Sequence, residues 1–205
     1  MNMQAQTRKG RKFDQVIDGA RNIFLSQGFE GASVDVIARQ AGVSKATLYS
    51  YFPDKQALFM AVLNQECDLQ RRAQMDIEFL QRDVRDALHH LAYSMLEFLM
   101  SDEGVSIFRV CVAEAQRFPE LGRAFYETGP STAMSHVAGY LSTPKVGNML
   151  DIDDPMKAAD LFMKLCRGDL MLRRLLCVSS EATHQEVSEA ADEVVATFMA
   201  RYRKA

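Results

Sequence analysis

Hydrophobic positions recur at intervals of three and four residues through most of this chain, with polar residues between them. That interval is the period of an α-helix with one buried face, whereas a half-buried strand alternates at every second residue. We find no stretch with strand alternation, so the pattern predicts an all-α protein of about nine helices. The predicted helices cover about residues 10–27, two short segments within 33–52, then 54–80, 83–100, 103–117, 119–141, 155–178 and 183–204.

Several predicted helix boundaries are marked by residues with known terminal preferences. Gly28 suits a C-terminal stop, Pro119 suits a first helical turn, and Thr183 opens a capping-box pattern. Gly129–Pro130 is expected to kink or split the seventh helix, because proline removes a backbone donor. The turn-forming stretch 142–154 is expected to be a loop.

Residues 33–52 have the pattern of two short helices joined by a glycine turn. Ser33 and Ser44 are each placed to cap a helix, because a serine hydroxyl accepts a hydrogen bond from an amide two or three residues further on. Gly42 lies between the helices, where the backbone is expected to need a positive φ that glycine adopts without a Cβ clash. Phe52–Pro53 ends the second helix, because proline disfavours the α region at the residue before it.

The second of these short helices is predicted to have a buried side and an outer side. Leu48 and Phe52 lie one helical repeat apart and share the inward face. The inward set is completed by residues from the first short helix and the turn: Ile37, Ala38, Ala41 and Val43. The residues left for the outer face are Lys45, Ala46, Thr47, Tyr49 and Tyr51. A helix with a small, basic, hydroxyl-rich outer face is suited to the major groove of DNA.

Charge and composition agree with a polyanion bound at one end of the chain. Residues 1–55 carry a balance of +3 and residues 56–205 a balance of −6, within a net charge of −3 over 205 residues. Residues 1–9 are expected to form a basic, flexible tail. The four cysteines are scattered without a C-x-x-C pair, and no apolar run is long enough for a membrane span. These features favour a cytoplasmic protein.

The N-terminal stretch strongly resembles the DNA-binding head of the TetR family of transcriptional repressors. The residues that carry the resemblance are the run Ile37–Ser44, the run Thr47–Phe52 and the pair Asp54–Lys55. The resemblance implies a helix-turn-helix DNA-binding domain over about residues 10–55, in which the first helix braces the other two.

Individual DNA contacts are predicted from residue type. Lys45 and Lys55 are expected to contact phosphate, and Thr47 is expected to reach a base or a thymine methyl. By the resemblance, Tyr49 and Tyr51 lie on the DNA face, with packing against the first helix as the alternative for each. The full predicted set adds small Ala46 and the capping serines: Ser33, Ser44, Lys45, Ala46, Thr47, Tyr49, Tyr51 and Lys55.

The remainder of the chain, residues 56–205, is predicted to be a ligand-binding and dimerisation domain. The run from Arg109 to Tyr126, followed by Gly129–Pro130, looks like the AefR-like C-terminal domain found within the family. The resemblance implies a homodimer formed by the last two long helices, and the alternative is that both helices are internal core. The predicted dimer residues are Phe162, Leu165, Leu176, Val187, Ala191, Val194, Val195, Phe198 and Tyr202.

The resemblance also implies a cavity for a small apolar or amphipathic effector that weakens DNA binding. Twelve methionines and twelve phenylalanines, with no tryptophan, give the interior an adaptable apolar character. Ordinary core packing remains the alternative for each candidate, because helical spacing does not distinguish a filled core from a lined pocket. The predicted ligand-binding residues are Met95, Phe98, Leu99, Phe108, Cys111, Phe125, Tyr126, Met134 and Met163.

No catalytic motif points to an enzyme, and we expect no cofactor or metal. There is no nucleophile elbow, phosphate loop or H-E-x-x-H pattern. The function favoured by the sequence is a ligand-responsive repressor whose dimer binds a palindromic operator and is released by a small molecule. Two alternatives remain: a regulator triggered by oxidation of Cys67 or Cys111, and a helical enzyme with a vestigial DNA-binding head.

Overall fold

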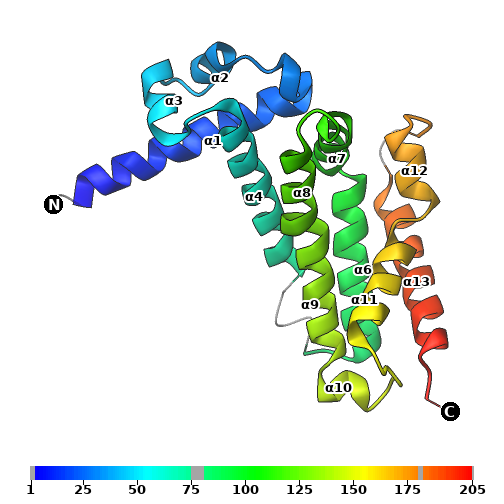
Figure 1. Cartoon of the computed structure of the whole chain (residues 1–205). Coiled ribbons are helices and arrows are strands. Elements are labelled where there is room, and N and C mark those ends of the chain that lie inside the picture. Colours follow the sequence, from blue (N-terminus) through cyan, green and yellow to red (C-terminus); the bar gives the residue numbers. More distant parts are fainter. Residues whose placement is uncertain (1–2, 75–80, 180–181, 205) are drawn as a thin grey trace. The chain divides into compact units, whose positions relative to one another are not determined.

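The computed structural model describes residues 3–74, 81–179 and 182–204, and this part of the chain is all-α, as the sequence predicts. The chain divides into two compact units, whose helices are labelled in Figure 1. Unit 1 comprises Met1–Glu66 and Ser106–Phe125, and unit 2 comprises Cys67–Val105 and Tyr126–Ala205. Among the described residues, we find no helix that is both long and apolar enough to cross a membrane.

The helices of unit 1 include the four at the N-terminal end of the chain. They are α1 (Met3–Gly31), α2 (Val34–Gln40), α3 (Lys45–Tyr51) and the first part of α4 (Lys55–Gln74), joined by most of α7 (Asp102–Glu114) and α8 (Pro119–Tyr126). The predicted two short helices and their glycine turn are confirmed as α2, Gly42 and α3.

The first helix differs from its prediction at its start. It begins at Met3, so residues 3–9 of the predicted flexible tail are helical. At the other end, Gly28 has non-helical backbone angles, φ +71° and ψ 178°, so the first helical run ends there as predicted, and a second short run extends α1 to Gly31. Residues 75–80, the end of the predicted fourth helix, lie outside the described residues.

The core of unit 1 extends beyond the predicted DNA-binding domain of residues 10–55. Ile37, Leu48 and Leu58 are fully buried in one cluster, and α7 and α8 contribute to the same cluster. The contributing residues are Ile107, Cys111 and Leu121. A head of some fifty residues buries a smaller share of its surface than a larger domain does and is marginally stable by itself, and α7 and α8 enlarge its interior.

A close approach of backbones fixes α1 against the turn between α2 and α3. A Cβ built on Gly19 would lie 2.9 Å from both the Cβ and the backbone nitrogen of Ala41. Only glycine leaves room for the two segments at this separation. The turn itself uses Gly42, whose φ of +65° places it in the left-handed region where other residues are strained.

We expect Gly19→Ala to destabilise unit 1, although alanine is the better helix former. The overpacking costs about 1–3 kcal/mol, whereas helix propensity returns at most about 1 kcal/mol. Thermal unfolding followed by circular dichroism should therefore give a lower Tm. Gly10→Ala is the matched control, because Gly10 lies in the same helix with open space around it. A Tm for Gly19→Ala at or above that of the parent would contradict the packing argument.

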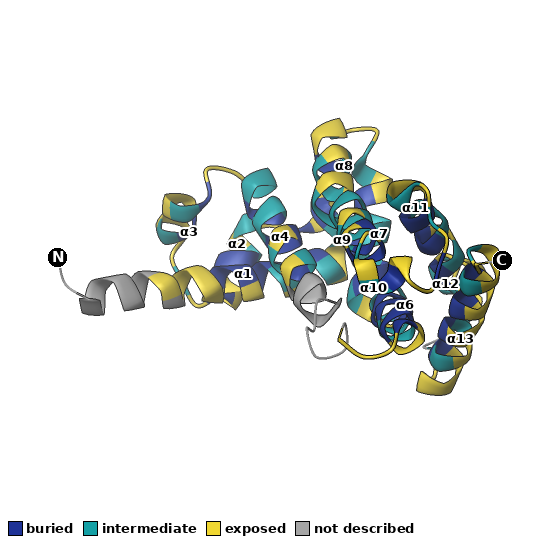
Figure 2. Cartoon of the chain, turned by 90° about the horizontal axis from the view of Figure 1, so that it is seen from below, coloured by how far each residue is buried: buried dark blue, intermediate teal, exposed yellow. Residues whose placement is uncertain are grey.

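Unit 2 is a bundle built around α6 (Val84–Met100), which packs against α13 (His184–Arg201). Figure 2 shows α6 largely buried, in keeping with nine buried residues spread along its length. A second pair is formed by α9 (Thr132–Leu141) and α11 (Pro155–Cys166). The π-helical turn η1 (Glu127–Ser131) joins α8 to α9, which confirms that Gly129–Pro130 interrupts the predicted seventh helix.

Two other predicted elements of unit 2 are subdivided. The predicted helix over 155–178 breaks at Gly168 into α11 and α12 (Asp169–Leu175). The predicted loop over 142–154 contains the short helix α10 (Pro144–Gly147). The capping box at the start of α13 is confirmed, since Thr183 and Glu186 bond each other's backbone amides. The Glu186 carboxylate accepts hydrogen bonds from the Thr183 amide and the Thr183 hydroxyl, and these bonds lower the pKa of the carboxyl because they favour its ionised form.

Candidate functional site

The α2–α3 segment holds α3 with its outer face open to solvent. The Ser44 hydroxyl accepts a hydrogen bond from the Thr47 amide at 3.1 Å, and the Ser33 hydroxyl accepts one from the Asp35 amide at 3.3 Å. Behind α3, Leu48 is fully buried and Phe52 is 5% exposed. Capping at the start and burial along the back together fix the helix without using its outer side chains.

The outer face of α3 carries most of the predicted DNA-contacting residues. Lys45, Ala46 and Tyr49 are exposed, and Thr47 is half-buried with its hydroxyl 2.8 Å from that of Ser44. The capping serines Ser33 and Ser44 are exposed as well. This surface, formed by Ser33, Ser44, Lys45, Ala46, Thr47 and Tyr49, is called the α3 face below.

An ion pair between α2 and α3 crosses this surface. The Lys45 ammonium nitrogen lies 2.9 Å from Oδ1 of Asp35, and both side chains are more than half exposed. The hydrogen bond to Asp35 is the main reason that the pKa of Lys45 is raised above its ordinary value. Lys45 is therefore a cation at neutral pH, and its contact with Asp35 lies on the surface predicted to contact DNA.

Two of the predicted DNA-contacting residues have structural contacts in unit 1. Tyr51 is half-buried and lies edge-on against Phe13, with ring centroids 5.8 Å apart, which is the packing alternative raised for it. The Lys55 ammonium donates to the carbonyls of Glu30 and Ala32 at 3.3 Å and lies 4.7 Å from the centre of the Phe29 ring. Phosphate contact by either residue stays a prediction.

The predicted effector-binding residues are divided between the two units. Phe108, Cys111 and Phe125 belong to unit 1, where Phe108 and Phe125 contact edge to face at 6.2 Å. Cys111 is 2% exposed within the unit 1 core, so its thiol is core packing. The others, Met95, Phe98, Leu99, Tyr126, Met134 and Met163, belong to unit 2.

Within unit 2 these six residues differ widely in exposure. Met95 and Met163 are buried, at 4% and 5% exposure, and Phe98, Leu99 and Met134 are half-buried. Tyr126 is 56% exposed and does not line an enclosed space within its own unit. A cavity shared by all nine residues stays a prediction.

Five of the nine predicted dimer-interface residues are buried inside unit 2, as in the internal-core alternative raised for them, and the interface itself stays a prediction. Phe162, Val187, Ala191, Val195 and Phe198 are at most 4% exposed inside unit 2. The Phe162 and Phe198 rings meet at right angles, 5.3 Å apart, where α11 packs against α13. Side chains already enclosed by their own chain have no surface left for a partner.

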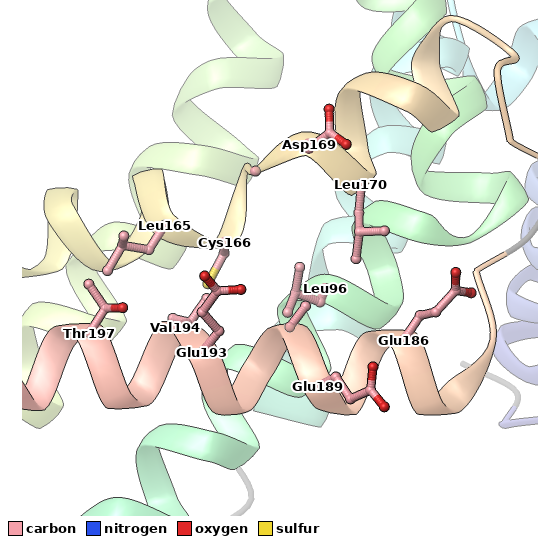
Figure 3. Close-up of a pocket in the computed structure, with 12 residues that line it drawn as sticks. Leu96, Leu165, Cys166, Asp169, Leu170, Glu186, Glu189, Glu193, Val194 and Thr197 are labelled. Atoms are coloured by element: carbon pink, nitrogen blue, oxygen red, sulfur yellow. The ribbon is translucent and has the colours of Figure 1, made fainter.

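A groove of about 490 Å³ opens beside α13, where the chain turns from α11 into α12 (Figure 3). Its apolar lining includes Leu165 and Val194 from the predicted interface, and Leu170 and Ala190, which the prediction missed. Glu189 and Glu193 line it from α13. The sequence signal for this hollow is Gly168, which separates two helices that the periodic pattern joins.

Burial raises the pKa of Cys166, which also lines the groove, to about 12, so its thiol stays neutral.

Large apolar side chains are exposed on and after α12. Leu172, Leu176 and Val178 are 55%, 65% and 67% exposed. We call these three residues the α12 ridge. Leu176 belongs to the predicted interface, and the other two residues were missed. Of the remaining predicted residues, Tyr202 is half-buried against Phe198, with ring centroids 4.9 Å apart.

Comparisons with known proteins agree with this geometry. Residues 16–62 match the family model for bacterial regulatory proteins of the tetR family, and residues 86–204 match the C-terminal domain of AefR-like transcriptional repressors. The second match alone covers more than half of the chain. The chain is a TetR-family transcriptional regulator.

Whole-length relatives support the same assignment. This chain resembles the flavonoid-responsive regulator FrrA, with 37% identity over 95% of this chain and 98% of FrrA, at a TM-score of 0.77. It also resembles a TetR-family regulator from Mesorhizobium loti, with 30% identity over 96% and 99% of the two chains, at a TM-score of 0.85. The Bacillus subtilis regulator YvkB is 25% identical over 75% of this chain and 78% of its own.

Proposed function

We propose that this TetR-family regulator is a homodimeric repressor that binds a palindromic operator and is released by a small-molecule effector. The observation that carries the proposal is the α3 face, in which a capped helix anchored by Leu48 presents Lys45, Ala46 and Thr47 to solvent. No catalytic role is assigned to any residue.

The α3 face suits the major groove in three respects. The N-terminal end of α3 offers backbone amides and the positive end of the helix dipole to phosphate, and Lys45 adds a full charge. Ala46 has no side chain beyond Cβ and permits close approach to base edges. Thr47 supplies both a methyl group and a hydroxyl, which can contact thymine or a base acceptor.

Two copies of the chain are needed because one α3 helix reads only one half-site. The dimer contact that we propose places the α12 ridge of one copy against the α13 groove of the other. The groove supplies the apolar Leu165 and Leu170, and its rim carries Glu189 and Glu193. Arg173 is exposed on α12 beside the ridge, so the two surfaces are complementary in charge as well as in hydrophobicity. Apolar side chains exposed to this extent on adjacent turns are typical of interaction sites.

The effector is proposed to be small, with a largely apolar body, and to act by preferring one arrangement of the two heads. It can weaken operator binding only by the difference between its affinities for the free and DNA-bound states. The resemblance to a flavonoid-responsive regulator over almost the whole chain supports an aromatic effector.

The experiment that tests the proposal is an operator-release titration with the full-length chain. A fluorescent duplex obtained by selection from a random library is bound by the protein, and a panel of flavonoids and fatty acids is then added. The proposal expects one compound class to lower the anisotropy and, in the absence of DNA, to raise the Tm of the protein. The labelled duplex is also competed with unlabelled selected duplex and with random duplex. Competition by random duplex as effective as that by the selected duplex would contradict the repressor assignment.

A further inference from the structure

A buried hydroxyl group without a hydrogen-bond partner lies in unit 2. Tyr140, on α9, is 8% exposed, and its phenolic oxygen has no partner among the described residues. Buried polar groups in folded proteins are almost always hydrogen-bonded, because an unpaired one has lost its bonds to water. The exceptions need a cause, and one recognised cause is a place reserved for a ligand.

The surroundings of Tyr140 combine polar and apolar character. His136 lies one helical turn earlier on the same face of α9, and its Nδ1 is also buried. The helix packed against α9 is α11, which buries the small Ala158 and Ala159 together with Met163. Alanine side chains occupy little space, and a methionine side chain repacks readily around a bound group.

The charge near Tyr140 limits what the hydroxyl can bind. Burial, with a smaller contribution from the Asp83 carboxylate, raises the pKa of Tyr140 to about 12, so the group remains a protonated donor at neutral pH. The same carboxylate repels an anion placed beside the hydroxyl. A neutral acceptor, such as a ring carbonyl or a phenol oxygen, accepts the hydrogen bond from Tyr140 and is not repelled by Asp83. A carboxylate also accepts the hydrogen bond, but the Asp83 carboxylate repels it.

We infer that Tyr140 is the polar anchor of the effector site, and that the effector is a neutral aromatic molecule bearing a carbonyl or hydroxyl group. The inference rests on the proposed function, since it names the chemistry of the effector in that scheme. It adds a residue that the sequence-based set of nine does not contain, because a tyrosine on an apolar helix face has the same spacing as core.

Two opposite effects are expected when Tyr140 is replaced by phenylalanine. Without ligand, Tyr140→Phe should raise the Tm, because it removes an unpaired buried hydroxyl and keeps the ring. With the trihydroxyflavone apigenin as probe, the Kd measured by calorimetry should be about tenfold weaker than for the parent, equivalent to the loss of about 1.4 kcal/mol. A purely structural role would still raise the Tm but would leave the Kd for apigenin unchanged.

The controls separate this inference from the proposed function. Tyr93→Phe removes a surface hydroxyl that lies 3.0 Å from His184, and it should leave the Kd for apigenin unchanged. Decanoate, an anionic amphiphile, should bind more weakly than apigenin. An equal Kd for Tyr140→Phe and the parent would overturn the inference. So would a result in which decanoate binds to the protein and apigenin does not. The same samples are tested for binding to the selected duplex, and only failure there would count against the repressor itself.

Discussion

Replacing Lys45 by glutamate is expected to weaken binding to the selected duplex on the order of 100-fold in about 0.1 M salt, because a dimer then meets phosphate with two reversed charges. The side chain is about half exposed, so the fold of unit 1 should persist. Lys45→Ala should reduce the slope of log K against log salt by about 2, one phosphate contact for each of two heads. Fluorescence anisotropy at four salt concentrations measures both quantities.

Asp35→Asn is the informative counterpart to Lys45→Glu. It removes the acid that pairs with Lys45 at 2.9 Å and leaves the lysine in place. DNA binding should therefore become several-fold tighter, mostly toward non-specific duplex, and the gain should fade as salt rises. Lys157→Glu, an exposed charge reversal in unit 2, controls for net charge and should change little. A loss of DNA affinity for Lys157→Glu as large as that for Lys45→Glu would show that total charge, and not the α3 face, governs binding.

The second large effect is expected at the α12 ridge. A Leu172→Glu/Leu176→Glu double variant should be a monomer by sedimentation at concentrations where the parent is a dimer. Its affinity for the selected duplex should fall by about 10²–10⁴, because linkage of two heads supplies a gain of that size. The helical spectrum should be unchanged, since both side chains are more than half exposed.

Val112→Glu is the control for this variant. Val112 is 59% exposed on α7, in unit 1, so it matches the ridge residues in exposure but lies outside the proposed interface. It should remain dimeric. If the ridge variant sediments as a dimer, the second copy does not contact α12, and the interface must be sought elsewhere.

Local structure around α3 was predictable because each feature depends on a few adjacent residues. The two serine caps and the positive φ of Gly42 follow from local backbone chemistry. The contacts of Lys55 were not predictable in this way. Its ammonium bonds the carbonyls of Glu30 and Ala32, which are more than twenty residues away in the sequence.

The residues of a dimer interface are hard to predict from sequence for a related reason. Helical periodicity shows that one side of a helix is buried, but not whether its own chain or a partner covers it. Phe162 and Phe198 are covered by each other, while Leu172 and Val178 stand exposed outside the periodic stripe. The chain breaks into α11 and α12 at Gly168, where the groove forms. To predict this break, one glycine would have to outweigh the strong apolar periodicity on both sides of it.

The effector anchor illustrates a third limit. Their adaptable, apolar character makes methionines and phenylalanines the natural candidates for a cavity. Tyr140 is set apart from them only by its unpaired oxygen, and pairing is a property of the folded chain. A sequence pattern can propose that a side chain is buried, but it does not reveal which buried polar atoms lack partners.

The most direct measurement of the central claim is selection of duplexes from a random library by the full-length chain, followed by the stoichiometry of the enriched complex. If two α3 helices read one DNA molecule, the enriched sequences contain an inverted repeat with half-site centres about 10 base pairs, or a multiple of that, apart. The complex then holds an even number of chains, two for each palindrome. Enrichment of a single unrepeated half-site bound by one chain, or no enrichment at all, would contradict it.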